Sequence, residues 1–137
     1  MSSTGNVESI VKLKHLYFDK INFWRSGAKV SANDLVLNFT KSYEFNEAHD
    51  GCLVRLECNI HDATNAIIRL SVSVTGEFLC SETNLVRRDQ LLRKNTLAIL
   101  FPYVRSQISL VTAQPELVPI VLPPMNIESV FENSEES

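Results

Sequence analysis

The chain has 137 residues, of which 45% are apolar and 21% charged, and a formal net charge of −3. This length predicts a single domain over residues 1–137, and the composition is typical of a globular protein rather than a disordered one. The small negative charge provides no basic face for nucleic acid, and no apolar run approaches the roughly 20 residues of a membrane-spanning helix. We therefore expect no binding to nucleic acid and no membrane insertion.

The amino-terminal residues MSSTGNVESIV lack the basic and apolar regions of a secretory signal peptide, so we expect a cytoplasmic protein. Residues 1–8 are polar, and we expect them to be disordered. From Ser9 onward the residues alternate, which predicts a strand. Its first face carries Val11, Leu13, His15 and Tyr17. Residues 24–34 follow as a predicted connecting loop.

Three further strands are predicted from apolar residues that recur at every second position. They cover residues 35–46, 52–60 and 66–75, and are separated by the turns EAHDG and HDATN. The inward-facing residues are Leu35, Leu37, Phe39, Tyr43 and Phe45, then Val54, Leu56, Cys58 and Ile60, then Ala66, Ile68, Leu70, Val72 and Val74. Such short turns predict antiparallel pairing, with one polar face and one face that another layer must cover.

The pattern becomes helical after FLCSETN, residues 78–84, in which Thr83 or Asn84 is a suitable N-cap. The polar side of this helix carries Arg87, Arg88, Arg93 and Lys94, as a solvated helix face does. An apolar stripe at helical spacing follows, through Leu97, Leu100, Phe101, Val104, Ile108 and Val111. Pro102 lies inside the stripe, so either two helices meet there or one helix is kinked. The unbroken stripe favours one kinked helix.

Residues 113–131, AQPELVPIVLPPMNIESVF, contain four prolines, which excludes a regular helix or a central strand. The apolar residues of this segment either fill the core or cover an apolar groove or an oligomer interface. The final residues 132–137, ENSEES, are predicted to be disordered. Strands followed by helices predict an α+β fold, a four-stranded antiparallel sheet with helices packed on one face.

No pattern typical of catalysis is present. We find no glycine-rich phosphate loop and no GxSxG, and the three histidines fit no metal-ligand spacing. Cys52, Cys58 and Cys80 form no CxxC and are expected to be small buried side chains. We therefore expect a protein that is not an enzyme and that holds no metal and no cofactor.

The carboxy-terminal sequence LFPYVRSQISLVTAQPELVPIVLPPMNIESVF resembles the signature of the SecB family of export chaperones. The matching residues are Leu100, Phe101, Pro102, Tyr103, Arg105, Ile108, Leu122, Pro124, Asn126, Glu128 and Phe131. LYFDKINF at 16–23 is similar to the first strand of the family, and AIIRLSVSVTGEFLC at 66–80 is similar to its last strand. Together these segments cover most of the chain in the family's order.

The resemblance implies an ATP-independent chaperone, a holdase, that binds unfolded polypeptides in hydrophobic grooves and assembles as a homotetramer, a dimer of dimers. By match, the client-binding groove would include Phe78, Phe101, Tyr103, Leu122 and Met125, to which we add Trp24 from the aromatic cluster after the first strand. The stripe residues Leu97, Leu100, Val104, Ile108 and Val111 would form the oligomer interface, because the long helix lies there in the family.

One departure from the family bears on the partner. In export chaperones of this family the outer sheet face carries acidic residues that dock the translocase ATPase, whereas Lys20, Trp24 and Ser81 stand at the matching positions here. This difference favours a chaperone dedicated to the antitoxin of a toxin–antitoxin–chaperone system over a general export chaperone that delivers precursors to the translocase. A third interpretation is an oligomeric scaffold protein without client binding.

Overall fold

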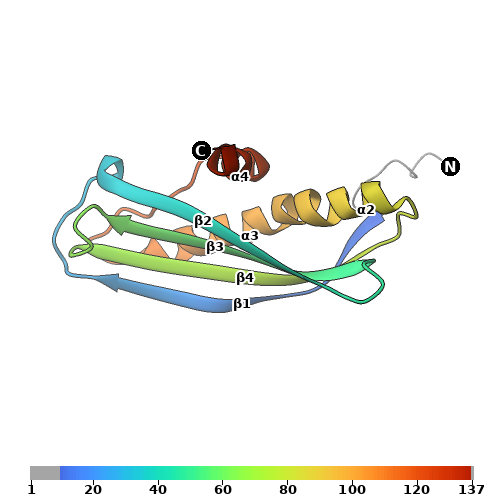
Figure 1. Cartoon of the computed structure of the whole chain (residues 1–137). Coiled ribbons are helices and arrows are strands. Elements are labelled where there is room, and N and C mark those ends of the chain that lie inside the picture. Colours follow the sequence, from blue (N-terminus) through green and yellow to red (C-terminus); the bar gives the residue numbers. More distant parts are fainter. Residues whose placement is uncertain (1–9, 137) are drawn as a thin grey trace.

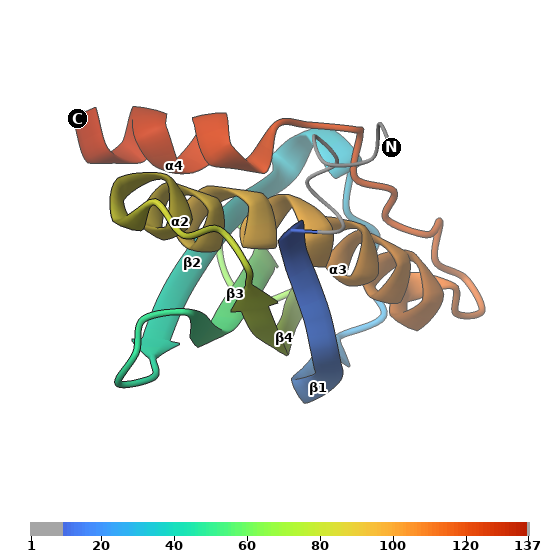
Figure 2. The same ribbon diagram turned by 90° about the vertical axis from the view of Figure 1, so that its right-hand side faces the viewer.

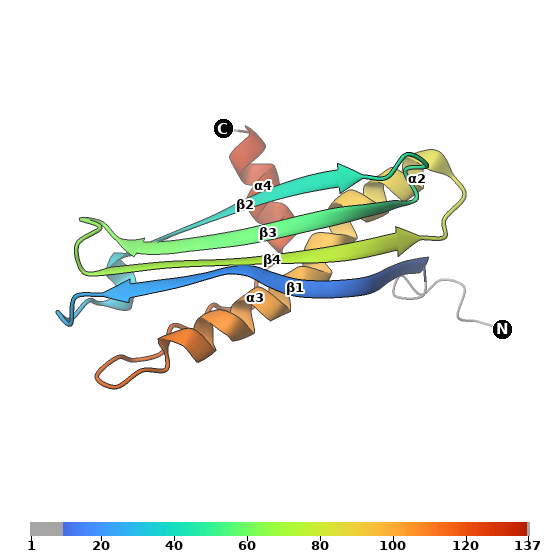
Figure 3. The ribbon, with the colours of Figure 1, turned by 90° about the horizontal axis from the view of Figure 1, so that it is seen from below.

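The computed structural model describes residues 10–136, with the backbone alone at 32 and 132–136. Four antiparallel strands form one sheet in the order β1-β4-β3-β2 (Figures 1 and 3). The strands are β1 (Val11–Arg25), β2 (Leu35–Phe45), β3 (Gly51–Asp62) and β4 (Ile68–Cys80). β2, β3 and β4 are joined as two successive hairpins, as predicted. β1 pairs with β4, so residues 26–34, which include the short 3-10 helix Ala32–Asp34, cross one end of the sheet to reach β2.

The helices all lie on one face of the sheet (Figure 2). They are α2 (Leu85–Gln90), a π-helical turn (Leu91–Asn95), α3 (Thr96–Thr112) and α4 (Ile127–Glu136). Asn84 caps α2, because its side chain accepts a hydrogen bond from the backbone N–H of Arg87 at 3.0 Å. The predicted α+β fold is confirmed. Within residues 10–136, no helix is long and apolar enough to span a membrane.

The core lies between the sheet and α3. The inward side chains of β3 and β4 are buried against the apolar stripe of α3. The fully buried contacts include Leu56, Val72, Val74, Leu97, Leu100, Val104 and Ile108. Pro102 lies inside α3 and is exposed, so one helix continues through it, as the unbroken stripe predicts. The π-helical turn before α3 was not predicted.

Two β-bulges in β1 correct the predicted faces of this strand. The register with β4 shifts between Leu13 and His15 and again between Phe18 and Lys20. Each extra residue reverses the alternation, because side chains on a strand change face at every position. As a result Leu16 and Phe18 are half-buried, whereas His15 and Tyr17 are exposed. The strand also continues to Arg25, through residues predicted as loop.

The other differences concern element ends. The predicted strand 66–75 is β4, which begins at Ile68 and continues to Cys80, while Ala66 is exposed in the preceding turn. Residues 113–126 are extended, as the prolines require, but α4 begins at Ile127 inside the segment predicted to be non-helical. The backbone of residues 132–136 is helical, where we predicted disorder. The predictions for residues 1–8 and residue 137 lie outside the described residues.

Candidate functional site

A groove of about 680 Å³ lies between one end of the sheet and the extended segment 113–126. Its sheet side is formed by Leu35 and Leu37 of β2, Ile60 of β3 and Ile68 of β4. Its opposite wall is formed by the extended segment, and it is lined there by Glu116, Leu117, Val118, Pro119, Ile120, Val121, Leu122 and Pro123. Arg25, Ala28, Lys29 and Val30 complete the lining. The groove is therefore mainly aliphatic, with a few charged residues.

Several of these apolar side chains are exposed. Val118 is 84% exposed, Val121 is 66% exposed and Leu37 is 37% exposed. By contrast Ile60 and Ile68 are buried at the base of the groove. Apolar side chains that water contacts in a concave site favour an apolar ligand, because covering them removes that contact.

The wall of the groove is held by polar side chains on one face of α3. Arg105 donates from Nε to the carbonyl oxygen of Leu122 at 2.7 Å, and Ser109 donates to that of Ile120 at 3.0 Å. The Thr112 hydroxyl accepts from the backbone N–H of Ile120 at 2.8 Å and donates to the Ile108 carbonyl at 2.7 Å. Residues 105, 109 and 112 are spaced at i, i+4 and i+7, so they lie on one helix face.

A second anchor comes from the sheet. Arg25, the last residue of β1, donates from Nη1 to the carbonyl oxygen of Pro115 at 2.7 Å and from Nη2 to that of Glu116 at 3.2 Å. The prolines cannot continue a helix, so the chain leaves α3 in an extended conformation. The wall of the groove is thus fixed to both α3 and β1.

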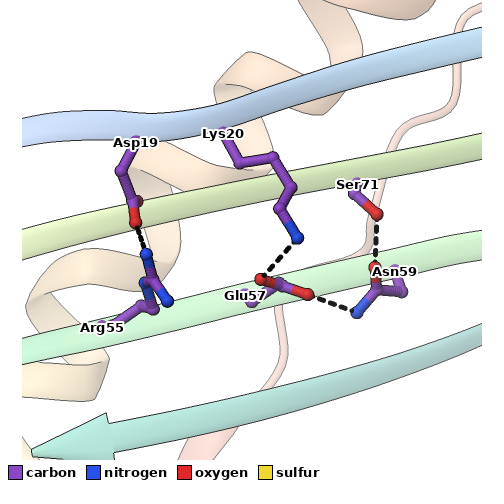
Figure 4. A network of polar contacts seen from close by, with 6 residues as sticks. All are labelled: Asp19, Lys20, Arg55, Glu57, Asn59 and Ser71. Atoms are coloured by element: carbon purple, nitrogen blue, oxygen red, sulfur yellow. Dashed lines mark hydrogen bonds and ion pairs between the residues drawn. The ribbon is translucent and has the colours of Figure 1, made fainter.

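The middle of the opposite face of the sheet is polar, and the charges there pair with one another (Figure 4). Arg55 contacts Asp19, and Lys20 lies 3.3 Å from Glu57, which also accepts from Asn59 at 3.0 Å. Burial raises the pKa of Asp19, but the hydrogen bonds that its carboxylate accepts, above all from Arg55, together with the charge of Arg55 outweigh this effect and lower the pKa. This face therefore carries balanced ion pairs rather than an acidic patch.

Comparison with known proteins decides the family. Residues 11–137 match the family model for SecB, preprotein translocase subunit SecB. The chain belongs to the SecB family. Proteins of the SecB family are chaperones. The suggested resemblance is thereby confirmed.

Two relatives illustrate how the chain compares with other proteins. The SecB-like chaperone Rv1957 of Mycobacterium tuberculosis, solved in complex with a ChAD peptide from the antitoxin HigA1 (Rv1956), superposes with a TM-score of 0.67 at 14% identity. The alignment covers 91% of this chain and 97% of that one, and it shows that the two share a fold. The protein MJ0357 of Methanocaldococcus jannaschii, named as uncharacterized, is 40% identical over 75 residues, which are 55% of this chain and 48% of MJ0357. The chain thus matches about half the length of that relative.

The residues predicted for the SecB client groove are not all in one place. Leu122 lines the groove, but Phe78 and Phe101 are buried in the core, where Phe101 meets Phe39 edge to face at 6.0 Å. Tyr103 is exposed on α3 and Met125 is half-buried beside the core. Trp24 lies on the opposite face of the sheet, against Arg69 at 4.4 Å. A client-binding role for these five remains a prediction.

The predicted oligomer interface is also placed differently. Leu97, Leu100, Val104 and Ile108 are at most 2% exposed, because they pack against the sheet of their own chain, and Val111 is half-buried. The stripe is therefore a core contact within the single chain, and its role in an oligomer interface stays a prediction. Exposed apolar residues of α3 include Tyr103 and Leu110.

The sequence interpretation missed most of the groove. Leu37, Ile60 and Ile68 were placed in the core because they belong to the inward pattern of their strands. The structure places Leu37 near the start of β2, Ile60 near the end of β3 and Ile68 at the start of β4, so the three meet at one end of the sheet and line the groove. The signal available in the sequence was the proline-rich segment, which was expected to cover either a groove or the core.

No catalytic or metal centre emerges from the described residues. In residues 10–136, no group of three or more histidine, cysteine, aspartate or glutamate side chains is placed to hold a metal ion. All three cysteines are buried, and burial raises the pKa of Cys52 and of Cys58 to about 12. These thiols are therefore protonated at neutral pH and unsuited to nucleophilic chemistry.

Proposed function

We propose that this SecB-family chaperone is an ATP-independent holdase that binds non-native polypeptides in the groove between the sheet and residues 113–126. The observation that carries the proposal is the exposed aliphatic lining of that groove. An unfolded segment would cover Leu37, Val118 and Val121, and each Å² of apolar area removed from water contributes about 25 cal/mol. Such contacts discriminate little between apolar sequences, which suits a client without fixed structure.

The wall leaves few backbone groups for a bound segment. The carbonyl groups of Ile120 and Leu122 already accept hydrogen bonds from α3, and Pro119 and Pro123 have no backbone N–H to donate. Addition of a regular β-strand to this wall is therefore disfavoured. Binding is proposed to depend on apolar side chains, and several grooves in a homotetramer would increase the overall affinity through multivalency.

We further propose that the client is an antitoxin rather than the general set of export precursors. Lys20 and Trp24 occupy positions that are acidic in export chaperones, and Lys20 pairs with Glu57, so the described residues around these two positions offer no acidic patch to a translocase ATPase. The complex of Rv1957 with an antitoxin peptide supports the same client class. General export stays the alternative, and stable capture of the translocase ATPase by the purified protein would favour it.

The second alternative is not a chaperone but an oligomeric scaffold protein that binds no client. It would be favoured if residues 115–125 filled the groove. In the structure this segment forms a wall instead, and about 680 Å³ remains open beside it, which supports ligand binding.

The groove proposal is tested by two variants at adjacent positions of β2. Leu37→Glu places a charge in the groove, whereas Val36→Glu places one on the outer face, where Val36 is 42% exposed and Leu37 is 37% exposed. Binding of a fluorescently labelled unfolded polypeptide is measured by anisotropy. We expect Leu37→Glu to weaken binding about tenfold or more and Val36→Glu to leave it unchanged. Equal effects of both variants would count against the groove.

The client is identified by mass spectrometry of proteins that co-purify from the native host. One dominant small antitoxin would support the dedicated chaperone, and many unfolded precursors would support general export. Absence of any client would contradict the holdase proposal. Native mass spectrometry of the same sample tests the proposed tetramer, and cell fractionation tests the proposed cytoplasmic location.

A further inference from the structure

Arg25 links two parts of the chain that are 90 residues apart. It is the last residue of β1 and pairs with Ile68 in the sheet register, and its guanidinium reaches the first turn after α3. The end of β1 and the segment that leaves α3 lie at the same end of the molecule (Figure 3). Two nitrogen atoms of the one side chain hold two successive carbonyl groups, those of Pro115 and Glu116.

The turn held by Arg25 contains an unfavourable backbone conformation. Glu116 has a φ of 64°, in the left-handed region that residues other than glycine rarely adopt. The turn is closed by a hydrogen bond from the Leu117 N–H to the Gln114 carbonyl at 3.1 Å. A conformation of this cost persists where neighbouring contacts hold it. The fixed planar fork of an arginine suits this task, because it can donate to two acceptors at once.

We propose that Arg25 is a positioning residue for the groove: it holds turn 114–117 against β1 and thereby sets the position of Val118 in the wall. This inference deepens the proposed function and rests on it for its effect on clients. α3 holds the same segment at Ile120 and Leu122, so the wall is anchored at two separate places. Loss of Arg25 would free the part before Ile120 and leave the rest attached to the helix.

Hydrogen exchange provides a direct test that does not depend on any client. In Arg25→Ala we expect the Leu117 amide to exchange about tenfold faster, the change expected for loss of a charge-assisted hydrogen bond. The Ile120 amide, which donates to Thr112, should change much less and serves as an internal control. Arg25→Lys replaces the two donating nitrogen atoms of the guanidinium with the single Nζ of lysine. We expect its Leu117 exchange rate to lie between those of the wild type and Arg25→Ala.

Lys29→Ala is the matched control variant. Lys29 lines the same groove, so its loss removes an equal charge without removing the hydrogen bonds to Pro115 and Glu116. We expect Arg25→Ala, but not Lys29→Ala, to accelerate exchange at Leu117. Arg25→Ala should also weaken binding of the labelled unfolded polypeptide about fivefold relative to the wild type. The thermal midpoint of unfolding should be similar in the two variants.

The outcomes separate this inference from the proposed function. An unchanged Leu117 rate in Arg25→Ala would overturn the positioning role, and so would faster exchange throughout the sheet, which would indicate a general loss of stability. Local acceleration together with weaker client binding would support both proposals. If the Leu117 amide exchanges faster in Arg25→Ala but the wild type binds no unfolded polypeptide, the positioning role is supported and the holdase proposal is contradicted.

Discussion

Arg105 on α3 donates from Nε to the carbonyl oxygen of Leu122, 2.7 Å away, and so attaches the extended segment to the helix that precedes it. Val104, the next residue toward the amino terminus, is fully buried against the sheet. One helix therefore supports two layers: its apolar stripe packs on the sheet, and its adjacent polar face holds the wall of the groove.

Removal of Arg105 should destabilise the protein and loosen the wall. We expect Arg105→Ala to lower the free energy of unfolding by about 1–2 kcal/mol, because a half-buried charge-assisted hydrogen bond is lost. Arg87→Ala is the control, since Arg87 is exposed and pairs with Glu82 at the surface; it should cost less than about 0.5 kcal/mol. Urea denaturation followed by circular dichroism measures both. Equal losses would mean that the bond to Leu122 contributes little.

Gly76 of β4 should not tolerate a side chain. A Cβ atom there would lie 2.8 Å from Cε2 of Phe78 and 2.9 Å from Cδ2 of Leu100, and both of these side chains are fully buried. We expect Gly76→Ala to lower the free energy of unfolding by about 1–3 kcal/mol through overpacking.

A double variant tests the cause of that loss. Leu100→Ala alone should cost about 2–5 kcal/mol through the cavity it creates. If the added methyl group occupies part of that cavity, Gly76→Ala with Leu100→Ala should cost clearly less than the sum of the single variants. Strict additivity in the denaturation data would show that the two side chains do not compete for space.

Asp62 organises the turn between β3 and β4 and should make stability sensitive to acid. Hydrogen bonds from the Thr64 side chain and from the backbone N–H groups of Ile68, Ile67 and Ala66 hold the pKa of Asp62 well below its usual range. A carboxylate whose pKa is lower in the folded state contributes stability above its unfolded pKa of about 3.9. That contribution is lost as the pH falls from this value toward the depressed folded pKa.

Asp62→Asn removes this titration. The donors that now bond to two carboxylate oxygens would then face one amide oxygen and one N–H₂ group, which cannot accept a hydrogen bond. We expect the variant to be less stable at neutral pH and to lose less stability than the wild type between about pH 5 and pH 2. Asp34→Asn, which removes an exposed carboxylate, is the control. Parallel curves of unfolding midpoint against pH for wild type and Asp62→Asn would contradict the assignment.

The buried thiols should be unreactive in the folded protein. With a pKa of about 12, Cys52 and Cys58 would be thiolate in only about one molecule in ten thousand at pH 8, and both are covered by the core. We expect no alkylation by iodoacetamide over an hour in buffer and full alkylation in urea, as measured by intact mass. Rapid labelling of the native protein would indicate that the sheet opens between β3 and its neighbours.

The local pattern predicted β2 and β3 well, because one face of β3 is buried and one face of β2 is partly covered, so alternation appears directly in the residue types. The same reasoning failed for β1 because of its two bulges. In the sequence, the break in alternation at a bulge looks the same as a polar residue at an inward position. α4 was missed because its first turn follows a proline-rich segment and its remainder is acidic, a composition that is also typical of a disordered end. The helix is held by Ile127 and Phe131, which are buried against the rest of the protein.

The sequence by itself determined the fold class and the extended course of residues 113–126, because alternation, helical spacing and proline chemistry are local properties. The resemblance of its motifs to those of SecB indicated the family. It did not determine which apolar residues line the groove. Leu37, Ile60 and Ile68 have the same alternation as the other inward residues of their strands, and only the tertiary structure places them together beside residues 113–126. Likewise, the hydrogen bonds from Arg25 to the carbonyl oxygens of Pro115 and Glu116 depend on where two distant chain segments meet. A local sequence pattern contains no information about such a meeting.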